Sequence, residues 1–462
     1  MGSTPSPRID RARPDDVLQL DIDRGRVPMS IGALLVLDPT QRPTAQLVRA
    51  TLLERAATIP RLGQRMTATP FGAGRPVWLD AGAAVIDGLV DERVADLPAD
   101  DGVEAHEAPG GGGVHLPGSL LDATADLVLE RLRRDRPLWR ARLLLDREGA
   151  VSGVALVAHH ALADGMGGLA VLGALADGEL AARVVARAPV APASLPPWRE
   201  LAREAWSEHL QALRAPRAAG RRVLRGVEEL DLRRPRLAES CSLLARTSDR
   251  RRLDVACVGL EDVRRAAHAR DATVNDLVVT AVTGTLVALL ERRGERVREL
   301  VVSMPVSRRR QDSAGVLGNS TGVVPVRVPA VADAEVRLAA LVAQERRVRS
   351  SGRGGSAAVL TPVFRGLAAV GAFQAFIDHQ RLVHTFVTNV RGPGERLRLA
   401  GTDVVAVVPV ATNPGDVTVS FDVMSYAGTL GITLVSDPLR VPEAPWLARA
   451  LDDELTALPD LT

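Results

Sequence analysis

Two adjacent histidines followed by an aspartate–glycine pair are the residues of this chain best suited to chemistry. His159 and His160 stand before a three-residue gap, and Asp164 and Gly165 come after it. A neutral histidine within hydrogen-bond reach of a hydroxyl group can take its proton as a general base while an acyl group is transferred to that oxygen. We therefore predict an acyl-transfer site in which His160 activates an acceptor alcohol.

The neighbours of His160 are expected to orient it. Side chains alternate across a β-strand, so one of the two histidines should face the core and the other a cleft. Asp164 can return to the site through a tight turn, where a carboxylate can fix the tautomer of the imidazole or pin the loop through an arginine. The spacing leaves both roles open. Gly165 permits a backbone conformation that a bulkier residue would resist.

Two other kinds of site compete for the same residues. His159, His160 and Asp164 are all zinc-ligand types, and a purely structural histidine pair beside a turn is the simplest alternative. However, the sequence has no H-E-x-x-H motif and no third clustered histidine, and strand alternation opposes joint ligation by adjacent residues. We therefore expect no metal and favour acid–base chemistry.

A second motif has the spacing of a hydrolase nucleophile but not its context. Gly318-Asn319-Ser320-Thr321-Gly322 matches G-x-S-x-G. That turn requires a strand before the serine and a helix after it, whereas here polar residues precede Ser320 and the strand-like run 323–326 follows. A glycine-rich loop that lines a cleft is the better interpretation.

Periodicity predicts the elements that must position the histidines. The apolar run Val154–Ala158 reads as a buried strand leading directly into His159, and Met166–Leu175 reads as a packed helix that follows the motif. Further strands are expected at 30–37, 137–145, 253–260, 301–306, 323–328, 382–390, 404–410, 417–426 and 430–434, and further helices from residue 44 and at 120–133, 261–268, 274–290 and 332–349.

Alternating strands and helices in both halves predict an α/β (α+β) fold with layered sheets. The proline- and arginine-rich segment from Ala188 to Arg250 lacks the alternating pattern of a strand and is interpreted as a helical crossover. The predicted division is therefore residues 1–187 for the unit that carries the histidines, 188–250 for the crossover, and 251–462 for a second, similar unit.

Composition excludes several classes of protein. The chain has 462 residues, with 58 basic and 56 acidic ones, and a net charge of +2. This balance lacks the excess of basic residues that is typical of nucleic-acid-binding proteins. Two cysteines, Cys241 and Cys257, are too few for a disulfide scaffold. The N-terminus lacks the apolar stretch of a signal peptide, and the uncharged run 277–290 is too short to span a bilayer. We expect a cytoplasmic protein, with peripheral contact at the inner membrane or lipid droplets left open.

The segment His159–Gly165 after its buried strand resembles the HHxxxDG signature of the bacterial wax ester synthase/diacylglycerol acyltransferase family, within the chloramphenicol acetyltransferase-like superfamily. Further segments occur in that family's order: Pro137-Leu138-Trp139 resembles its PLW motif, Thr273–Val278 its TVNDVVL segment, Met304–Ser307 with Gly318-Asn319 its PVS…GN stretch, Thr388–Pro393 its SNVPGP segment, and Ser425–Gly428 its SY-G segment. The resemblance covers nearly the whole chain.

This resemblance implies two chloramphenicol acetyltransferase-like domains with mixed sheets and an active-site tunnel between them. It implies that His160 is the base for an alcohol or diacylglycerol that attacks an acyl-CoA thioester directly, without an acyl-enzyme, to give a wax ester or triacylglycerol. His159, Asp164 and Gly165 would hold the loop. Acyl-CoA would be a co-substrate, and no cofactor is implied. The matching positions make Leu138, Trp139, Asn275, Asp276, Asn319, Thr388 and Asn389 candidates for substrate binding.

Some of these candidates have simpler interpretations. Leu138 and Trp139 suit core packing first and the lining of an acyl tunnel second. Asn275 and Asp276 would organise the wall between the domains, or would simply cap the helix that begins there.

The chain also departs from the family pattern. Thr388 and Arg391 replace a serine and a proline of the SNVPGP segment, residues 15–28 lack the usual aromatic and methionine-rich text, and aromatic residues make up only 3% of the chain. A carrier-protein donor, a natural-product acceptor, or a non-catalytic lipid-binding relative therefore stay as alternatives. The apolar stretch Val363–Phe373 suits a lipid surface or a buried helix, and the chain could be a monomer or a homodimer.

Overall fold

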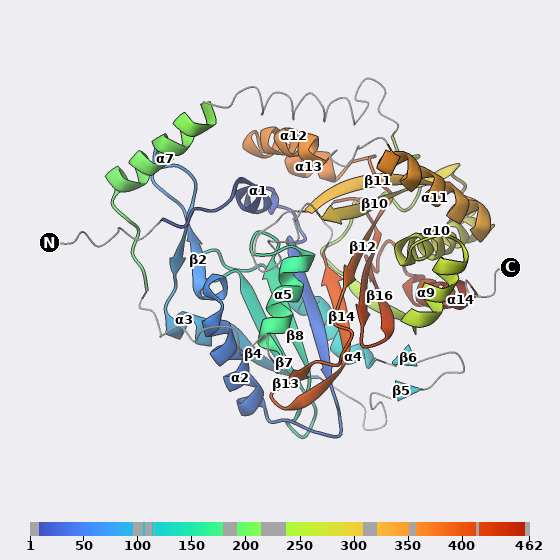
Figure 1. Ribbon diagram of the computed structural model, residues 1–462, viewed down its shortest axis with the longest axis horizontal. Helices are drawn as coiled ribbons and strands as arrows, with labels where there is room; N and C mark the ends of the chain where they lie inside the picture. Colours follow the sequence, from blue (N-terminus) through green and yellow to red (C-terminus); the bar gives the residue numbers. More distant parts are fainter. Residues whose placement is uncertain are drawn as a thin grey trace.

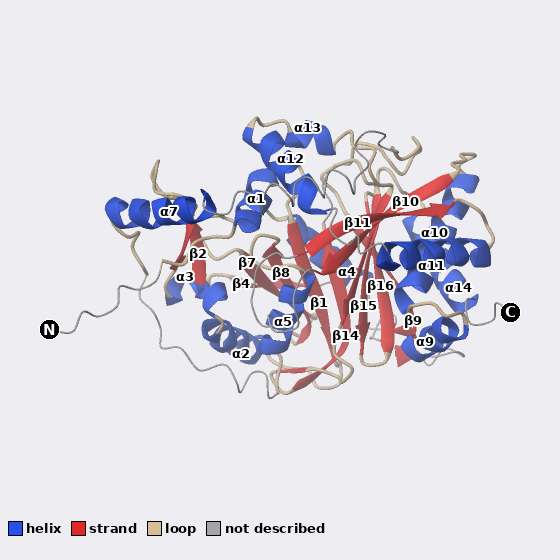
Figure 2. Cartoon of the chain, turned by 45° about the horizontal axis from the view of Figure 1, so that its top comes forward, coloured by secondary structure: helices blue, strands red, loops and turns tan. Residues whose placement is uncertain are grey.

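The computed structural model describes residues 9–95, 105–106, 113–114, 116–178, 192–213, 237–307, 321–350, 357–412 and 415–457. Two six-stranded mixed sheets lie at its centre, with helices packed on their outer faces (Figures 1 and 2). This arrangement confirms the predicted α/β class with mixed sheets.

The first sheet carries the histidine motif. In spatial order its strands are β13 (Arg398–Leu399), β14 (Thr402–Ala411), β1 (Ser30–Leu37), β8 (Val151–His159), β7 (Trp139–Leu145) and β4 (Val90–Val94). All neighbours pair antiparallel except β4 and β7. The motif therefore leaves the sheet from an interior strand, where its backbone is held on both sides.

Alternating side chains give this sheet two buried faces. Leu34 and Val36 of β1 and Ala155 and Val157 of β8 pack toward α4 (Gly118–Leu129). The intervening residues face α2 (Ala45–Thr58) and α5 (Gly165–Leu175), and Figure 1 shows α5 lying across β8 and β1. Because side chains alternate with a period of two residues, apolar residues at nearly every position of β1 and β8 serve both layers.

The second sheet is built from the C-terminal half. Its order is β11 (Thr321–Pro329), β10 (Glu299–Ser307), β12 (Thr385–Arg391), β15 (Val419–Tyr426), β16 (Thr429–Ser436) and β9 (Arg252–Gly259). The helices that accompany it are α9 (Leu260–Ala269), α10 (Val274–Arg292), α11 (Ala334–Ser350) and α14 (Ala444–Ala457), on the right of Figure 1.

Helix α10 forms the core of this half. Within the described residues it is the one helix long and apolar enough to cross a membrane by length and composition, but 78% of that apolar window is buried inside the fold. Leu277, Val282 and Leu286 are wholly buried in its hydrophobic cluster. Its hydropathy is therefore explained by packing within the protein.

The C-terminal half contributes two strands to the first sheet, which the sequence did not indicate. Strands β13 and β14 come from the C-terminal part, yet they complete the first sheet beside β1. Within the predicted crossover, the structure describes α7 (Trp198–Leu213) and residues 237–250, while residues 179–191 and 214–236 lie outside the described part. The division at residues 187 and 250 stays a prediction.

Some element boundaries differ from those predicted. The helix expected over 120–133 ends at Leu129, and the strand expected from residue 382 begins at Thr385. The stretch Val363–Phe373 spans most of α12 (Ala357–Ala369) and the start of α13 (Phe373–Ile377). Phe364 and Phe373 pack with Leu18 of α1 (Pro14–Ile22), although Val363 and Val370 are exposed. One face of this stretch is therefore packed against α1, and the other face is exposed.

The remaining small elements are η1 (Pro60–Gly63), α3 (Ala83–Asp87), and the strand pairs β2 (Gln64–Thr67) with β3 (Val77–Asp80) and β5 (Ala105–His106) with β6 (Gly113–Val114).

Candidate active site

The histidine motif forms a tight connection between an interior strand and a helix. Strand β8 ends at His159, and the amide of Leu162 donates to the carbonyl oxygen of His159 at 2.8 Å. Helix α5 begins at Gly165, with Asp164 as its N-cap. The strand–turn–helix context predicted for the motif is confirmed, and the loop that carries His160 is short and hydrogen-bonded at both ends.

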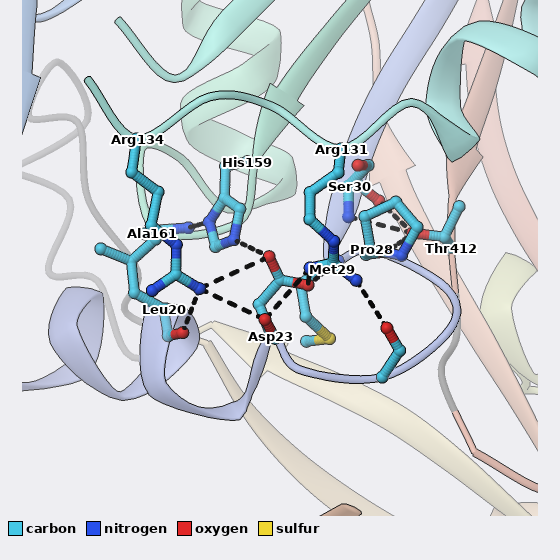
Figure 3. Close-up of polar contacts among 11 residues, drawn as sticks. Leu20, Asp23, Pro28, Met29, Ser30, Arg131, Arg134, His159, Ala161 and Thr412 are labelled. Carbon is cyan, nitrogen blue, oxygen red and sulfur yellow. Dashed lines mark hydrogen bonds and ion pairs between the residues drawn. The ribbon is translucent and has the colours of Figure 1, made fainter. Parts of the chain in front are cut away.

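His159 is buried and held in one tautomer. Its Nδ1 accepts a hydrogen bond from the amide of Ala161 at 2.9 Å, so this nitrogen carries no proton. The proton therefore lies on Nε2, which is 3.2 Å from Oδ2 of Asp23 (Figure 3). Both ring nitrogens are engaged with the protein, so His159 orients the loop and has no nitrogen left for a metal.

Asp23 anchors the loop from far away in the sequence. Its carboxylate accepts from Arg131 at 2.7 Å and from the amide of Met29 at 3.1 Å, and Arg134 lies 3.9 Å away (Figure 3). Burial alone would raise the pKa of Asp23, but the hydrogen bonds from His159 and Arg131 and the charge of Arg131 outweigh it and lower this pKa to about 2. Asp23 is therefore an ionised partner that holds the N–H of His159.

His160 continues toward the opposite side from His159. Its amide donates to the carbonyl oxygen of Met29 at 2.9 Å, which extends the β1–β8 pairing by one step. Continued alternation directs its side chain to the face of Ala158, which lines the pocket described below, although His160 itself lies in the turn after β8 and is not a lining residue. The side chain is partly buried. Burial lowers the pKa of His160, while the charge of Asp164 opposes this shift. A lowered pKa keeps the imidazole neutral near pH 7, as a base requires.

Asp164 and Gly165 shape the turn after His160. Oδ1 of Asp164 accepts from the amide of Gly167 at 2.8 Å, so its carboxylate caps α5 and is only 2% exposed. The expectation that Gly165 supplies an unusual backbone conformation is wrong, because it is an ordinary first residue of a helix. A Cβ at Gly165 would instead lie 3.1 Å from Val390, so the glycine is explained by the close approach of β12.

An apolar pocket lies beside the motif, between the first sheet, α5 and the ends of β12 and β15. Ala158, Leu162, Ala163 and Gly165 belong to its lining. The other lining residues are Ile31, Gly32, Ala33, Leu62, Trp139, Arg140, Leu156, Val157, Gly168, Leu169, Val171, Leu172, Leu175, Thr388, Val390, Pro409, Val410, Ala411, Asp422, Val423 and Met424. Such a lining suits an aliphatic chain.

The structure brings some of the predicted substrate-binding residues to this pocket. Trp139 lines it, and its indole N–H donates to the carbonyl oxygen of Leu62 at 2.7 Å, which fixes the ring. Thr388 also lines it. Leu138 is wholly buried in the core instead, and its carbonyl accepts from the amide of His159.

The remaining predicted residues lie farther from the pocket or outside the described part. Asp276 forms a capping box with Thr273, which supports the interpretation of a helix cap for this residue. Asn275 contacts Asn389 at 3.3 Å, and thus joins α10 to β12. Asn319 and Ser320 fall outside the described residues, but the segment after Ser320 is strand β11, which is the wrong context for a nucleophile turn.

Two residues of the site could not be inferred from the sequence. Asp23 ends a helix 136 positions before His159, and no spacing connects them. Asp422 lines the pocket within strand β15, where it looks like one polar residue of an alternating strand. A single charged residue among Val419, Phe421 and Val423 was the available signal.

Comparison with known proteins agrees with the site and the fold. The catalytic-domain model of wax ester synthase/diacylglycerol acyltransferase matches residues 112–278, and the C-terminal-domain model of the same family matches residues 317–459. A putative diacylglycerol O-acyltransferase of Mycobacterium bovis is 28% identical over 449 residues, covering 95% of this chain and 92% of the relative. A probable diacylglycerol O-acyltransferase of Mycobacterium tuberculosis is 25% identical and covers 97% and 99%.

Solved structures show the same fold. The wax ester synthase/diacylglycerol acyltransferase of Marinobacter aquaeolei superposes with a TM-score of 0.65 at 19% identity, covering 98% of this chain and all of that one. The first condensation domain of the calcium-dependent antibiotic synthetase gives 0.58 at 18% identity, covering 97% of each chain. With both domain models matched in order, this chain belongs to the wax ester synthase/diacylglycerol acyltransferase family of O-acyltransferases.

Proposed function

We propose that this enzyme transfers a fatty acyl group from acyl-CoA to the hydroxyl of a long-chain alcohol or a diacylglycerol, with His160 as the general base. The family and its diacylglycerol O-acyltransferase members support the reaction type. The observation that carries the assignment to this site is the apolar pocket that adjoins the His160 loop, because it joins a base to space for an aliphatic chain.

The proposed step needs no covalent intermediate on the protein. His160 takes the hydroxyl proton as the acceptor oxygen forms a bond to the thioester carbonyl carbon, and the carbon–sulfur bond then breaks. The protonated imidazole returns its proton to the leaving CoA thiolate, so the base is regenerated. His159 and Asp23 act as positioning residues, because their hydrogen bonds hold the loop.

An acceptor-dependence assay tests this function. Palmitoyl-CoA is incubated with hexadecanol, with dioleoylglycerol or with no acceptor, and free thiol and lipid product are followed together. The proposal predicts thiol release in equal amount to ester formed, and only when an acceptor is present. Turnover only from an acyl group on a phosphopantetheine carrier protein would favour the carrier-dependent alternative. Tight acyl-CoA binding without turnover would favour the lipid-binding one.

Helix α7 supports a peripheral contact with a lipid surface as part of this proposal. Arg199, Arg203, Trp206 and Leu210 share one exposed helical face at spacings of four, three and four residues. Trp206 is 69% exposed, although tryptophan side chains in folded proteins are usually mostly buried. Aromatic and arginine side chains on one face suit an anionic membrane surface. Sedimentation with phosphatidylglycerol vesicles, compared for the wild type and W206S, tests it. Equal sedimentation of the two proteins would contradict it.

A further inference from the structure

The apolar pocket has one polar corner, which the acyl-transfer step does not use. Apart from Trp139, whose indole N–H is bonded to Leu62, the lining residues with polar side chains are Arg140, Thr388 and Asp422. The guanidinium of Arg140 is directed to the carboxylates of Asp91 and Glu130, each at 2.6 Å. Thr388 and Asp422 are therefore the polar groups that remain for a molecule in the pocket.

These two side chains meet where the two sheets come together. Thr388 on β12 and Asp422 on β15 are hydrogen-bonded at 2.8 Å through Oγ1 and Oδ1. Oδ2 of Asp422 accepts from the amide of Ala411, at the end of β14, at 2.6 Å. Asp422 is only 2% exposed. The corner is thus rigid, because three strands from both sheets fix its atoms.

Burial favours the neutral form of this carboxyl and raises the pKa of Asp422 to about 7, against the opposing hydrogen bonds of Thr388 and Ala411. A neutral carboxyl can donate its proton to Oγ1 of Thr388, and the hydroxyl hydrogen of Thr388 must then turn away from Asp422. The pair can therefore both accept from and donate to a group in the pocket that Thr388 lines.

The corner lies close to the reacting end of the pocket. Ala158 of β8 pairs with Ile31 of β1, which pairs with Ala411 of β14. Ala411 is thus two strand spacings, on the order of 10 Å, from the end of β8 that leads into His160. A chain that reaches His160 through the pocket passes this corner near its reactive group.

We propose that Thr388 and Asp422 form a subsite that hydrogen-bonds an oxygen function, such as a hydroxyl or keto group, on the aliphatic chain of a substrate. The inference rests on the proposed function and specifies its substrate class: an oxygenated chain is preferred over a plain one. The oxygen can belong to the acyl donor or to the acceptor, because either chain could occupy the pocket.

Competition between matched substrates tests the subsite. One arm compares hexadecanoyl-CoA with a series of hydroxyhexadecanoyl-CoA isomers, using hexadecanol as acceptor. The other arm compares hexadecanol with hexadecanediols, using hexadecanoyl-CoA as donor. We expect at least one oxygenated substrate to exceed its plain counterpart by about tenfold in kcat/KM, equal to about 1.4 kcal/mol for one hydrogen bond, and the arm in which it appears identifies the chain.

T388V removes the hydroxyl without changing the side-chain shape and should abolish this preference, because it should lower kcat/KM for the oxygenated substrates about tenfold more than for the plain ones. The matched control is T385V on the same strand. This substitution also removes a hydrogen bond, the one from Thr385 to the carbonyl oxygen of Val419, but Thr385 does not line the pocket. The preference for oxygenated substrates should therefore persist in T385V. D422N should behave like T388V.

Two results would overturn the subsite. The first is equal kcat/KM for plain and oxygenated chains in both arms with the wild type. The second is a loss in T388V that is the same for every substrate, which would indicate that the pair only joins the sheets. If no substrate pair releases thiol, the proposed function fails, and equilibrium dialysis of the same CoA esters and alcohols then decides the subsite by the same preference.

Discussion

Replacing Asp23 with asparagine should destabilise the protein and misplace the loop that carries His160. In the wild type, both carboxylate oxygens only accept hydrogen bonds: Oδ2 from Nε2 of His159, and Oδ1 from Arg131 and the amide of Met29. An asparagine amide turned either way points its NH2 group at one of these donors. His159 cannot relieve this by changing tautomer, because its Nδ1 already faces the N–H of Ala161.

The size of the effect follows from the pKa of Asp23. The folded state lowers it from 3.8 to about 2, and each unit is worth about 1.4 kcal/mol, so the ionised carboxylate contributes about 2 kcal/mol to the free energy of unfolding. Because the pKa is depressed on folding, this contribution is fully present above pH 4 and is lost as the pH falls through about 2. D23N should therefore lose about 2 kcal/mol at pH 7, and the difference from the wild type should shrink as acid is added.

Urea unfolding followed by circular dichroism, from pH 7 downward, measures this difference. D254N is a suitable control, because Asp254 is a partly buried carboxylate on β9, in the second sheet, that accepts from Arg252 at 2.9 Å and does not contact the motif. In activity assays, D23N should lower kcat more than it changes KM, because the loop is displaced while the pocket remains. A free energy of unfolding within about 0.5 kcal/mol of the wild type at pH 7 would refute the reasoning.

Three further predictions follow from other parts of the site. Burial raises the pKa of Asp422 from 3.8 to about 7, so the folded state holds a proton that the unfolded state has lost. The free energy of unfolding of the wild type should therefore fall by roughly 3 kcal/mol relative to that of D422N between pH 5 and 8. A difference in urea unfolding that stays constant over this range would contradict the prediction. G32A should lose about 2 kcal/mol of unfolding free energy in thermal unfolding, because its Cβ would lie 2.4 Å from the carbonyl oxygen of Leu156. G294A should lose less despite the positive φ of Gly294, because no atom lies within 4 Å of its Cβ. The kcat/KM of the wild type should rise with pH through an apparent pKa below 6.5, because burial lowers the pKa of His160, and a midpoint above 7 would be inconsistent with His160 as the base.

Local features of the fold and site could be predicted from the sequence. The strand before His159, the helix after Gly165 and the strands at 30–37 and 417–426 follow from periodicity, which depends only on neighbouring residues. The order of the family-like segments added the fold class and the reaction. The elements depend on residues close together in the sequence, and the family resemblance depends on a combination of motifs that few other families contain.

Long-range pairings could not be predicted in this way. The placement of β13 and β14 in the first sheet, and the contact of Asp23 with His159, depend on tertiary packing that no local pattern encodes. The role of Gly165 was misjudged for the same reason, because the atom that excludes a side chain belongs to Val390, more than 200 residues away. The burial and hydrogen bonds of Asp422 arise only because β12 and β14 pack beside β15.

The most direct test of the central claim is the single-turnover rate of thiol release by H160A with saturating palmitoyl-CoA and hexadecanol. A general base typically contributes about 10²- to 10⁴-fold. H160A should therefore lose at least about 100-fold in this rate while its dissociation constant for palmitoyl-CoA stays close to that of the wild type. H268A, which removes an exposed histidine on α9, should react at the wild-type rate. If H160A retained more than about a tenth of the wild-type rate, His160 would not be the base.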